Sequence, residues 1–195
     1  MITAARSYEL DLLQIRGTIA GDSYYTQLDE QDFTEEMEDC DITPISKTPE
    51  GRLLYQEHLR QRTLGFQEYQ TEISNEYQAV AKPEELHYLA KDYNFDDGYW
   101  PLEQIIKNPN CDIRTARMIF WHCTPSYFAI THGHPSDIPK DSIHADNARL
   151  LLLIDTKARD NGFANQLPNA YEDPEIADMA KEGPVWEIPD TLWPQ

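Results

Sequence analysis

The chain is poor in basic side chains and in long apolar runs, and both shortages exclude classes of function. Its 195 residues include 16 Lys and Arg against 35 Asp and Glu, for a net charge of -19. Such a charge repels phosphate backbones and anionic lipid. The longest purely aliphatic run, residues 150–154, is far shorter than the ~20 residues that span a bilayer. We therefore expect neither direct nucleic-acid binding nor membrane insertion.

Cysteine and valine are also scarce. The 3 cysteines are odd in number, and Arg6, Glu9 and Asp11 interrupt any apolar signal-peptide core, so we expect reduced thiols and a cytoplasmic location. Valine occurs only at positions 80 and 185, whereas sheets favour valine. The composition therefore favours helices.

Apolar residues recur mostly at spacings of three and four, which is typical of helices. In the first helix the stripe consists of Tyr8, Leu12, Ile15 and Ile19. The expected helices cover residues 4–19, 49–80, 84–92, 101–107, 112–123 and 146–161, and a loop follows residue 131. We predict an all-α fold of six to eight helices. Its expected parts are an acidic helical arm at 1–48, a compact core at 49–162, and an acidic tail at 163–195 that packs on the core.

The most acidic stretch lies between residues 29 and 41 and contains no basic side chain. Phe33 and Met37 stand four apart within it and are expected to fix one short helix to the body while the acids face water. We predict that these acids bind a partner: Asp29, Glu30, Asp32, Glu35, Glu36, Glu38, Asp39 and Asp41.

Residues 92–98 have a partial calcium-loop pattern. Oxygen ligands stand at the first, third, fifth and twelfth places of such a loop, at Asp92, Asn94, Asp96 and Glu103. The sixth place requires glycine, yet Asp97 occupies it and Gly98 comes one residue late. We therefore favour a turn between helices, in which Asp96 or Asp97 caps the helix that starts near Pro101 and Gly98 takes a positive φ.

Other chemistry-bearing residues form no recognised motif. His122, Cys123, His132, His134 and His144 lack metal-site spacing, so exposed loop histidines are the favoured interpretation. Cys111 and Cys123 flank an apolar helix, as buried inert thiols do. Arg114 and Arg117 suggest a solvated face or partners for Asp96 and Asp97. No nucleotide or cofactor fingerprint is present, and we expect no cofactor, no metal and no enzymatic activity.

The run from Tyr93 to Gly98, then Asn108 to Asp112, Thr115-Ala116 and Phe120-Trp121, resembles a bacterial domain-of-unknown-function family, the one numbered 4274, over about residues 84–160. The resemblance implies a compact helical module without an established activity. It implies architectural roles, with Asn110 or Asp112 capping a helix and Trp121 filling the core. The motif positions are Tyr93, Asn94, Asp96, Asp97, Gly98, Asn110, Asp112 and Trp121.

Small acidic bacterial proteins on such modules resemble immunity proteins of polymorphic toxin systems. We therefore expect a protein that neutralises a cognate toxin by covering its basic active site. One alternative is a small hydrolase or metal-binding protein that uses Asp92, Asp96 and Glu103 or the loop histidines. Another is an interaction scaffold that uses Trp186 and Trp193.

Overall fold

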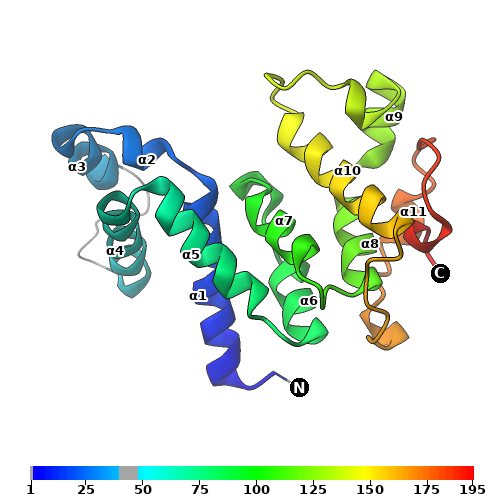
Figure 1. Ribbon diagram of the computed structural model, residues 1–195, viewed down its shortest axis with the longest axis horizontal. Helices are drawn as coiled ribbons and strands as arrows, with labels where there is room; N and C mark the ends of the chain where they lie inside the picture. The colour runs from blue at the N-terminus through cyan, green and yellow to red at the C-terminus, as the bar shows by residue number, and fades with distance from the viewer. Residues whose placement is uncertain (1, 40–47) are drawn as a thin grey trace. The chain divides into compact units, whose positions relative to one another are not determined.

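Residues 2–39 and 48–195, which the computed structural model describes, form helices joined by short connections (Figure 1). Within these ranges there is no β-strand, and one isolated parallel bridge pairs Asp112 with Ala164. The all-α prediction is therefore confirmed. The chain divides into two compact units, an N-terminal unit of residues 3–77 and a C-terminal unit of residues 78–195 together with Ile2.

The N-terminal unit contains α1 (Ala4–Gly21), α2 (Tyr24–Gln27), α3 (Glu30–Asp39), α4 (Pro49–Leu64) and α5 (Phe66–Gln78). Helix α4 packs against α1 and α2. The hydroxyl of Thr48 accepts a hydrogen bond from the Gly51 amide at 3.0 Å and Pro49 opens the helix, so the cap and the first turn are set by adjacent residues.

The expected single helix over 49–80 is wrong, because the chain breaks at Gly65 into α4 and α5. Gly65 has φ 85° and ψ 151°, a conformation that side-chain-bearing residues rarely adopt. Its amide still donates to the Gln61 carbonyl at 2.8 Å, which completes the last turn of α4. The low helix propensity of glycine would only weaken a helix, whereas the backbone conformation of Gly65 ends α4.

The expected apolar stripe of α1 is partly wrong, since Ile19 is buried but Tyr8 is 63% exposed. The rest of the buried face consists of Leu10, Leu13, Gly17 and Ala20. At Gly17 an added Cβ would lie only 2.4 Å from the Tyr77 hydroxyl oxygen. The side chain of Tyr77 therefore packs against the face of α1 that contains Gly17, where a larger residue would not fit. The hydrophobic pattern of α1 alone does not reveal this face.

The C-terminal unit is built around α8 (Ile113–His122), which contacts α6 (Pro83–Lys91), α9 (Pro125–His132), α10 (Ala145–Arg159) and α11 (Ile176–Met179) (Figure 1). Phe120 and Trp121 on α8 are almost fully buried, as predicted. The remaining elements are α7 (Trp100–Lys107) and the 3-10 helices η1 (Phe95–Asp97), η2 (Pro135–Asp137), η3 (Asn169–Tyr171) and η4 (Asp190–Leu192).

Helix α9 is not among the expected helices, and it begins with Pro125. Proline is tolerated at the first position of a helix, where its missing amide has no partner to lose, and Pro125 occupies that position. With α9 and the division of residues 49–80, the described ranges contain nine helices of eight residues or more, above the predicted six to eight.

Residues after α10 return to α8. The Trp121 indole donates to the Leu192 carbonyl at 2.7 Å, and Leu192 is fully buried. Trp186 meets Phe120 edge to face, with ring centroids 5.7 Å apart. No helix in the described ranges combines the length and the apolarity needed to cross a bilayer.

Candidate functional site

The C-terminal unit contains a cavity of about 550 Å³ between α6, α8 and the segment after α10. This volume lies in the range of small-molecule sites. Its lining includes His87, Lys91, Asp92, Met118, His122 and residues 170–175. Most of these side chains are polar or charged, so the cavity suits a polar ligand.

Three ligand-type side chains meet at this cavity: His122, Asp173 and Glu175. Their nearest nitrogen and oxygen atoms all lie within 4.8 Å of one another. His122 Nε2 lies 2.7 Å from Asp173 Oδ2, and these two side chains are 28% and 16% exposed. Glu175 is exposed. Together they place an imidazole nitrogen beside two carboxylates.

The fold fixes His122 and Asp173 from several sides. His122 ends α8, and its ring stacks on Phe95 with centroids 5.8 Å apart. Asp173 Oδ1 accepts a hydrogen bond from the Glu175 amide at 2.9 Å, which closes a local turn. The carboxylate of Asp173 therefore has a partner on each oxygen, and its rotamer is set without any ligand.

His87 forms a further part of the cavity wall. Its Nδ1 lies 3.0 Å from the Thr115 hydroxyl, and Tyr171 meets its ring edge to face at 5.1 Å. Burial, followed by the charge of Lys91, lowers the pKa of His87 below its usual value. His87 is therefore neutral at neutral pH, and Lys91 supplies the positive charge of the lining.

The segment that carries Asp173 is anchored by a buried carboxylate at the start of α8. Asp112 is fully buried, and its Oδ1 accepts from the Arg114 amide at 3.0 Å, which caps the helix as predicted. Its Oδ2 accepts from the amides of Gln166 and Leu167 at 2.6 and 2.9 Å. The Asp112 side chain therefore starts α8 and holds the returning chain.

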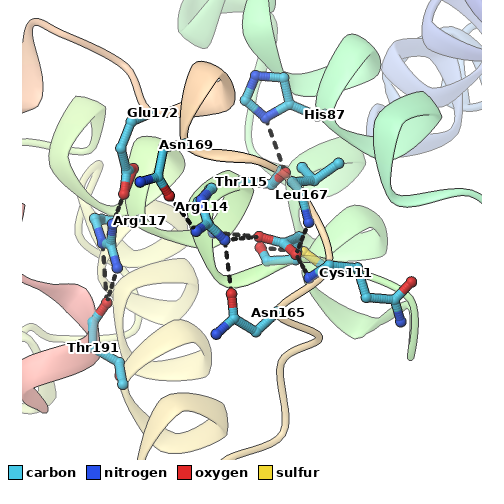
Figure 2. A network of polar contacts seen from close by, with 12 residues as sticks. His87, Cys111, Arg114, Thr115, Arg117, Asn165, Leu167, Asn169, Glu172 and Thr191 are labelled. Atoms are coloured by element: carbon cyan, nitrogen blue, oxygen red, sulfur yellow. Dashed lines mark hydrogen bonds and ion pairs between the residues drawn. The ribbon is translucent and has the colours of Figure 1, made fainter. Parts of the chain in front are cut away.

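Two arginines of α8 extend this network (Figure 2). The Arg114 guanidinium donates to the side-chain oxygens of Asn165 and Asn169 at 2.8 and 2.9 Å. Arg117, only 3% exposed, donates twice to the Thr191 carbonyl and forms an ion pair with Glu172. The expectation that both arginines face solvent or pair with Asp96 and Asp97 is wrong. The sequence signal that α8 is buried was the apolar run from Met118 to Trp121, because four consecutive apolar residues cover every side of a helix.

The described members of the predicted acidic partner-binding set lie on and just before α3. Asp29, Glu30, Asp32, Glu35 and Glu38 are exposed, and Glu36 is half-buried. The side chain of Asp39 and all of Asp41 lie outside the described residues. Phe33 and Met37 are fully buried, so their predicted anchoring role is confirmed. We call the six described acids the α3 acidic face.

Some members of the α3 acidic face have local partners. Glu30 pairs with Arg62 at 3.4 Å, Glu36 accepts from the Tyr24 hydroxyl at 3.1 Å, and Asp29 accepts from the Asp32 amide at 2.9 Å. Asp32, Glu35 and Glu36 form no ion pair with any residue in the described ranges. Their negative charge therefore stays available to a partner.

Residues 92–98 form a turn, as favoured, and not a calcium loop. Gly98 has φ 88°, and the Tyr93 hydroxyl donates to its carbonyl at 2.8 Å. The predicted cap of the helix near Pro101 is wrong, because α7 begins after Tyr99 without a side-chain cap. Asn94 caps the 3-10 helix η1 instead, since it accepts from the Asp96 amide at 3.2 Å. Glu103, the twelfth candidate ligand, is buried on α7 and pairs with Arg149 at 2.6 Å and with Lys107 at 3.1 Å.

The interpretation of His122 as an exposed loop histidine is wrong, because it ends α8 and is 28% exposed. The other three histidines of that group lie on or near α9. His132 and His144 have ring centroids 6.4 Å apart, and His144 Nε2 lies 3.3 Å from the Tyr127 hydroxyl. His134 Nδ1 lies 2.7 Å from the Ser136 hydroxyl. Within the described ranges, these three histidines belong to no cluster of three metal-ligating side chains.

Cys111 and Cys123 are buried free thiols, as interpreted. Burial raises the pKa of Cys111 to about 12 and also raises the pKa of Cys123. Because the thiolate is the nucleophile, both are inert at neutral pH.

Sequence reasoning missed Asp173 and Glu175. His122 is 51 positions from Asp173, and no spacing pattern links a helix end to two acids in an acidic tail. Only the returning segment brings them together.

The C-terminal unit thus belongs to the class of small all-α modules organised around one buried helix. Residues 81–157, from just before α6 to near the end of α10, match the family model described as Domain of unknown function (DUF4274). The predicted resemblance to the family numbered 4274 is therefore confirmed over that segment. No curated protein and no solved structure matches the chain. His87 and His122 lie inside the matched segment, whereas Asp173 and Glu175 follow it.

Proposed function

We propose that this protein is a non-catalytic, immunity-type inhibitor that acts in the cytoplasm. It binds a cognate bacterial toxin and covers the toxin's basic active site with the α3 acidic face. The observation that carries this proposal is the arrangement of α3, whose exposed carboxylates stand on a helix with fully buried Phe33 and Met37.

The contacts that fix α3 to α4 support a role for α3 in binding a partner. The Arg62 guanidinium donates to the carbonyls of Tyr25 and Leu28 at 2.7 and 2.9 Å, just before α3. The same guanidinium lies 4.5 Å from the centre of the Phe33 ring. Helix α4 therefore fixes the segment before α3 and the Phe33 side chain that anchors α3. Because α3 is already ordered, binding a partner costs less conformational entropy.

Charge within the N-terminal unit supports the same role. Arg16 pairs with Glu76 at 2.8 Å, and Arg60 pairs with Glu57 and Glu72, so both arginines are engaged by acids outside α3. A surface of one sign steers a partner of opposite sign and raises the association rate, toward about 10⁸–10⁹ M⁻¹s⁻¹ at low salt. The α3 acidic face therefore suits a partner with a basic surface.

The test is charge reversal on the α3 acidic face. The partner is first identified by copurification with the full chain, and the product of the neighbouring gene is the first candidate. A triple variant, Asp32→Lys, Glu35→Lys and Glu38→Lys, leaves the caps and the Arg62–Glu30 pair in place. We expect its Kd for the partner to rise at least about tenfold at low salt.

The matched control makes the same charge change elsewhere. Asp141→Lys, Asp160→Lys and Glu182→Lys replace exposed acids of the C-terminal unit. This control should keep its Kd within about twofold, because a specific face and not total charge sets the affinity. Equal affinity of the α3 variant and the wild type, or equal weakening of both variants, would contradict the proposal.

A further inference from the structure

We propose that His122, Asp173 and Glu175 form a binding site for a divalent transition-metal ion, with Zn²⁺ as the best-matched ion. The site lies at the wall of the cavity in the C-terminal unit. The site involves none of the α3 residues, so its test is independent of the test of the proposed inhibitor function.

The donor set points to this class of ion. One imidazole nitrogen and two carboxylates suit Zn²⁺ and its first-row neighbours, which accept mixed nitrogen and oxygen ligands. Calcium and magnesium prefer oxygen ligands alone. Of the two alternatives that the sequence offered, Asp92, Asp96 and Glu103 supply only oxygen, and the loop histidines supply only nitrogen. Neither group combines the two kinds of ligand atom.

The distances permit coordination after a small rearrangement. With bonds of about 2.0–2.1 Å, the ligand atoms of a tetrahedral zinc site lie about 3.3 Å apart. His122 Nε2 and Asp173 Oδ2 are 2.7 Å apart and need to separate slightly, while the third donor already lies within 4.8 Å of both. Glu175 is exposed, so side-chain rotation brings its carboxylate in without moving the core.

The backbone that carries the two acids is already ordered. Four contacts connect α6 and α8 to the returning segment, one after another along the chain: Arg114 with Asn169, His87 with Tyr171, Arg117 with Glu172, and His122 with Asp173. An ion therefore does not have to order this segment. Outer contacts of this kind orient metal ligands and commonly affect affinity.

The cavity gives the site its open position. Three protein ligands leave at least one coordination position of Zn²⁺ for water or another small ligand. The lining also contains Lys91 and the neutral His87. A bound ion together with Lys91 favours a small oxygen anion as the exogenous ligand.

The test is titration of the full chain with zinc chloride at neutral pH by calorimetry. We expect one ion per chain in the wild type, and at least about tenfold weaker binding in each of Glu175→Gln, Asp173→Asn and His122→Gln. Because Glu175 is exposed, Glu175→Gln decides the result even where a variant at His122 fails to fold. The control is His132→Gln, at an exposed histidine of the loop group, and it should bind as the wild type does.

Cobalt gives a second readout, since Co²⁺ bound by protein ligands absorbs visible light and the band should weaken in the same three variants. Three results would overturn the proposal. They are a wild-type Kd for zinc above about 1 mM, zinc affinity unchanged in both Glu175→Gln and Asp173→Asn, or affinity lost in His132→Gln.

Discussion

His58 on α4 shows at the residue scale how burial creates a pH-sensitive point. Its side chain is 5% exposed, its ring centroid lies 4.2 Å from that of Tyr25, and its Nδ1 has no hydrogen-bond partner among the described residues. Burial lowers the pKa of His58 to about 4, although Asp22 acts weakly in the opposite direction. The native state therefore holds this imidazole neutral.

Acid should consequently destabilise the protein through His58. The folded pKa lies below the unfolded value near 6.5, so stability is full above about pH 6.5 and is lost as the pH falls toward 4. We expect His58 to account for a loss of about 2 kcal/mol at pH 5 and about 3 kcal/mol at pH 4. The measurement is urea unfolding of the wild type and of His58→Phe at pH 7 and pH 5.

The wild type and His58→Phe should differ in how steeply their free energy of unfolding changes with pH. His58→Phe should lose less stability between these pH values, because phenylalanine takes up no proton. The same substitution at exposed His132 should keep the wild-type dependence. Parallel pH profiles for the wild type and His58→Phe would refute the assignment.

Asp112 marks the limit of residue-level prediction. Its role as a helix cap follows from its position before the apolar run of α8, because a short acidic side chain satisfies the first free amides. Its second oxygen accepts from Gln166 and Leu167, more than 50 positions later. Local sequence specifies the first contact only, since any later segment with free amides could have supplied the second.

At the element scale, the segment after α10 has little regular structure, yet polar side chains of α8 hold it in place. Arg117 and Trp121 both donate to main-chain carbonyls of η4, those of Thr191 and Leu192. The Leu192 side chain is fully buried in the C-terminal unit. This short 3-10 helix therefore belongs to the core.

We expect Leu192→Ala to lower the free energy of unfolding by about 2–5 kcal/mol, the usual cost of a cavity in place of a buried leucine. Tryptophan fluorescence during urea unfolding reports on it directly, since Trp193 lies against Trp121 with centroids 5.4 Å apart. Thr191→Ala is the control, because Thr191 is exposed and Arg117 bonds only its carbonyl. Similar stability of the two variants would show that η4 does not contribute to the core.

The helix boundaries were predicted correctly where a local signal determines them. The prediction failed where the backbone conformation of one residue or packing against another helix determines the structure. Helix α4 starts at residue 49 as predicted, because the Thr48 hydroxyl cap and the φ of Pro49 both act locally. Gly65 lies inside the single helix expected over residues 49–80, yet it breaks the chain into α4 and α5. The buried face of α1 depends on Tyr77, which no pattern within residues 4–21 reveals.

At the scale of the whole molecule, the net charge of -19 opposes compaction. Salt shortens the Debye length from about 30 Å at 0.01 M to about 10 Å at 0.1 M and so weakens this repulsion. We therefore expect Tm to rise by roughly 2–4 °C between these concentrations, equivalent to about 1 kcal/mol for a chain of this size. The measurement is thermal unfolding followed by circular dichroism.

The triple variant Asp141→Lys, Asp160→Lys and Glu182→Lys tests the cause of that rise. It lowers the negative charge without touching a buried residue, so its Tm should respond less to salt. A Tm that stays constant or falls as salt is added to the wild type would mean that self-repulsion does not limit stability.

The sequence alone determined the helical class, the acidic character, the anchors Phe33 and Met37 and the resemblance of residues 81–157 to a family model, because spacing, composition and motif are properties of the chain itself. Only the tertiary structure decided which face of α1 is buried, that Arg114 and Arg117 are structural, and that His122 meets Asp173 and Glu175. These features depend on contacts between segments tens of residues apart. Side-chain periodicity describes one element at a time and carries no information on which distant segment returns to it.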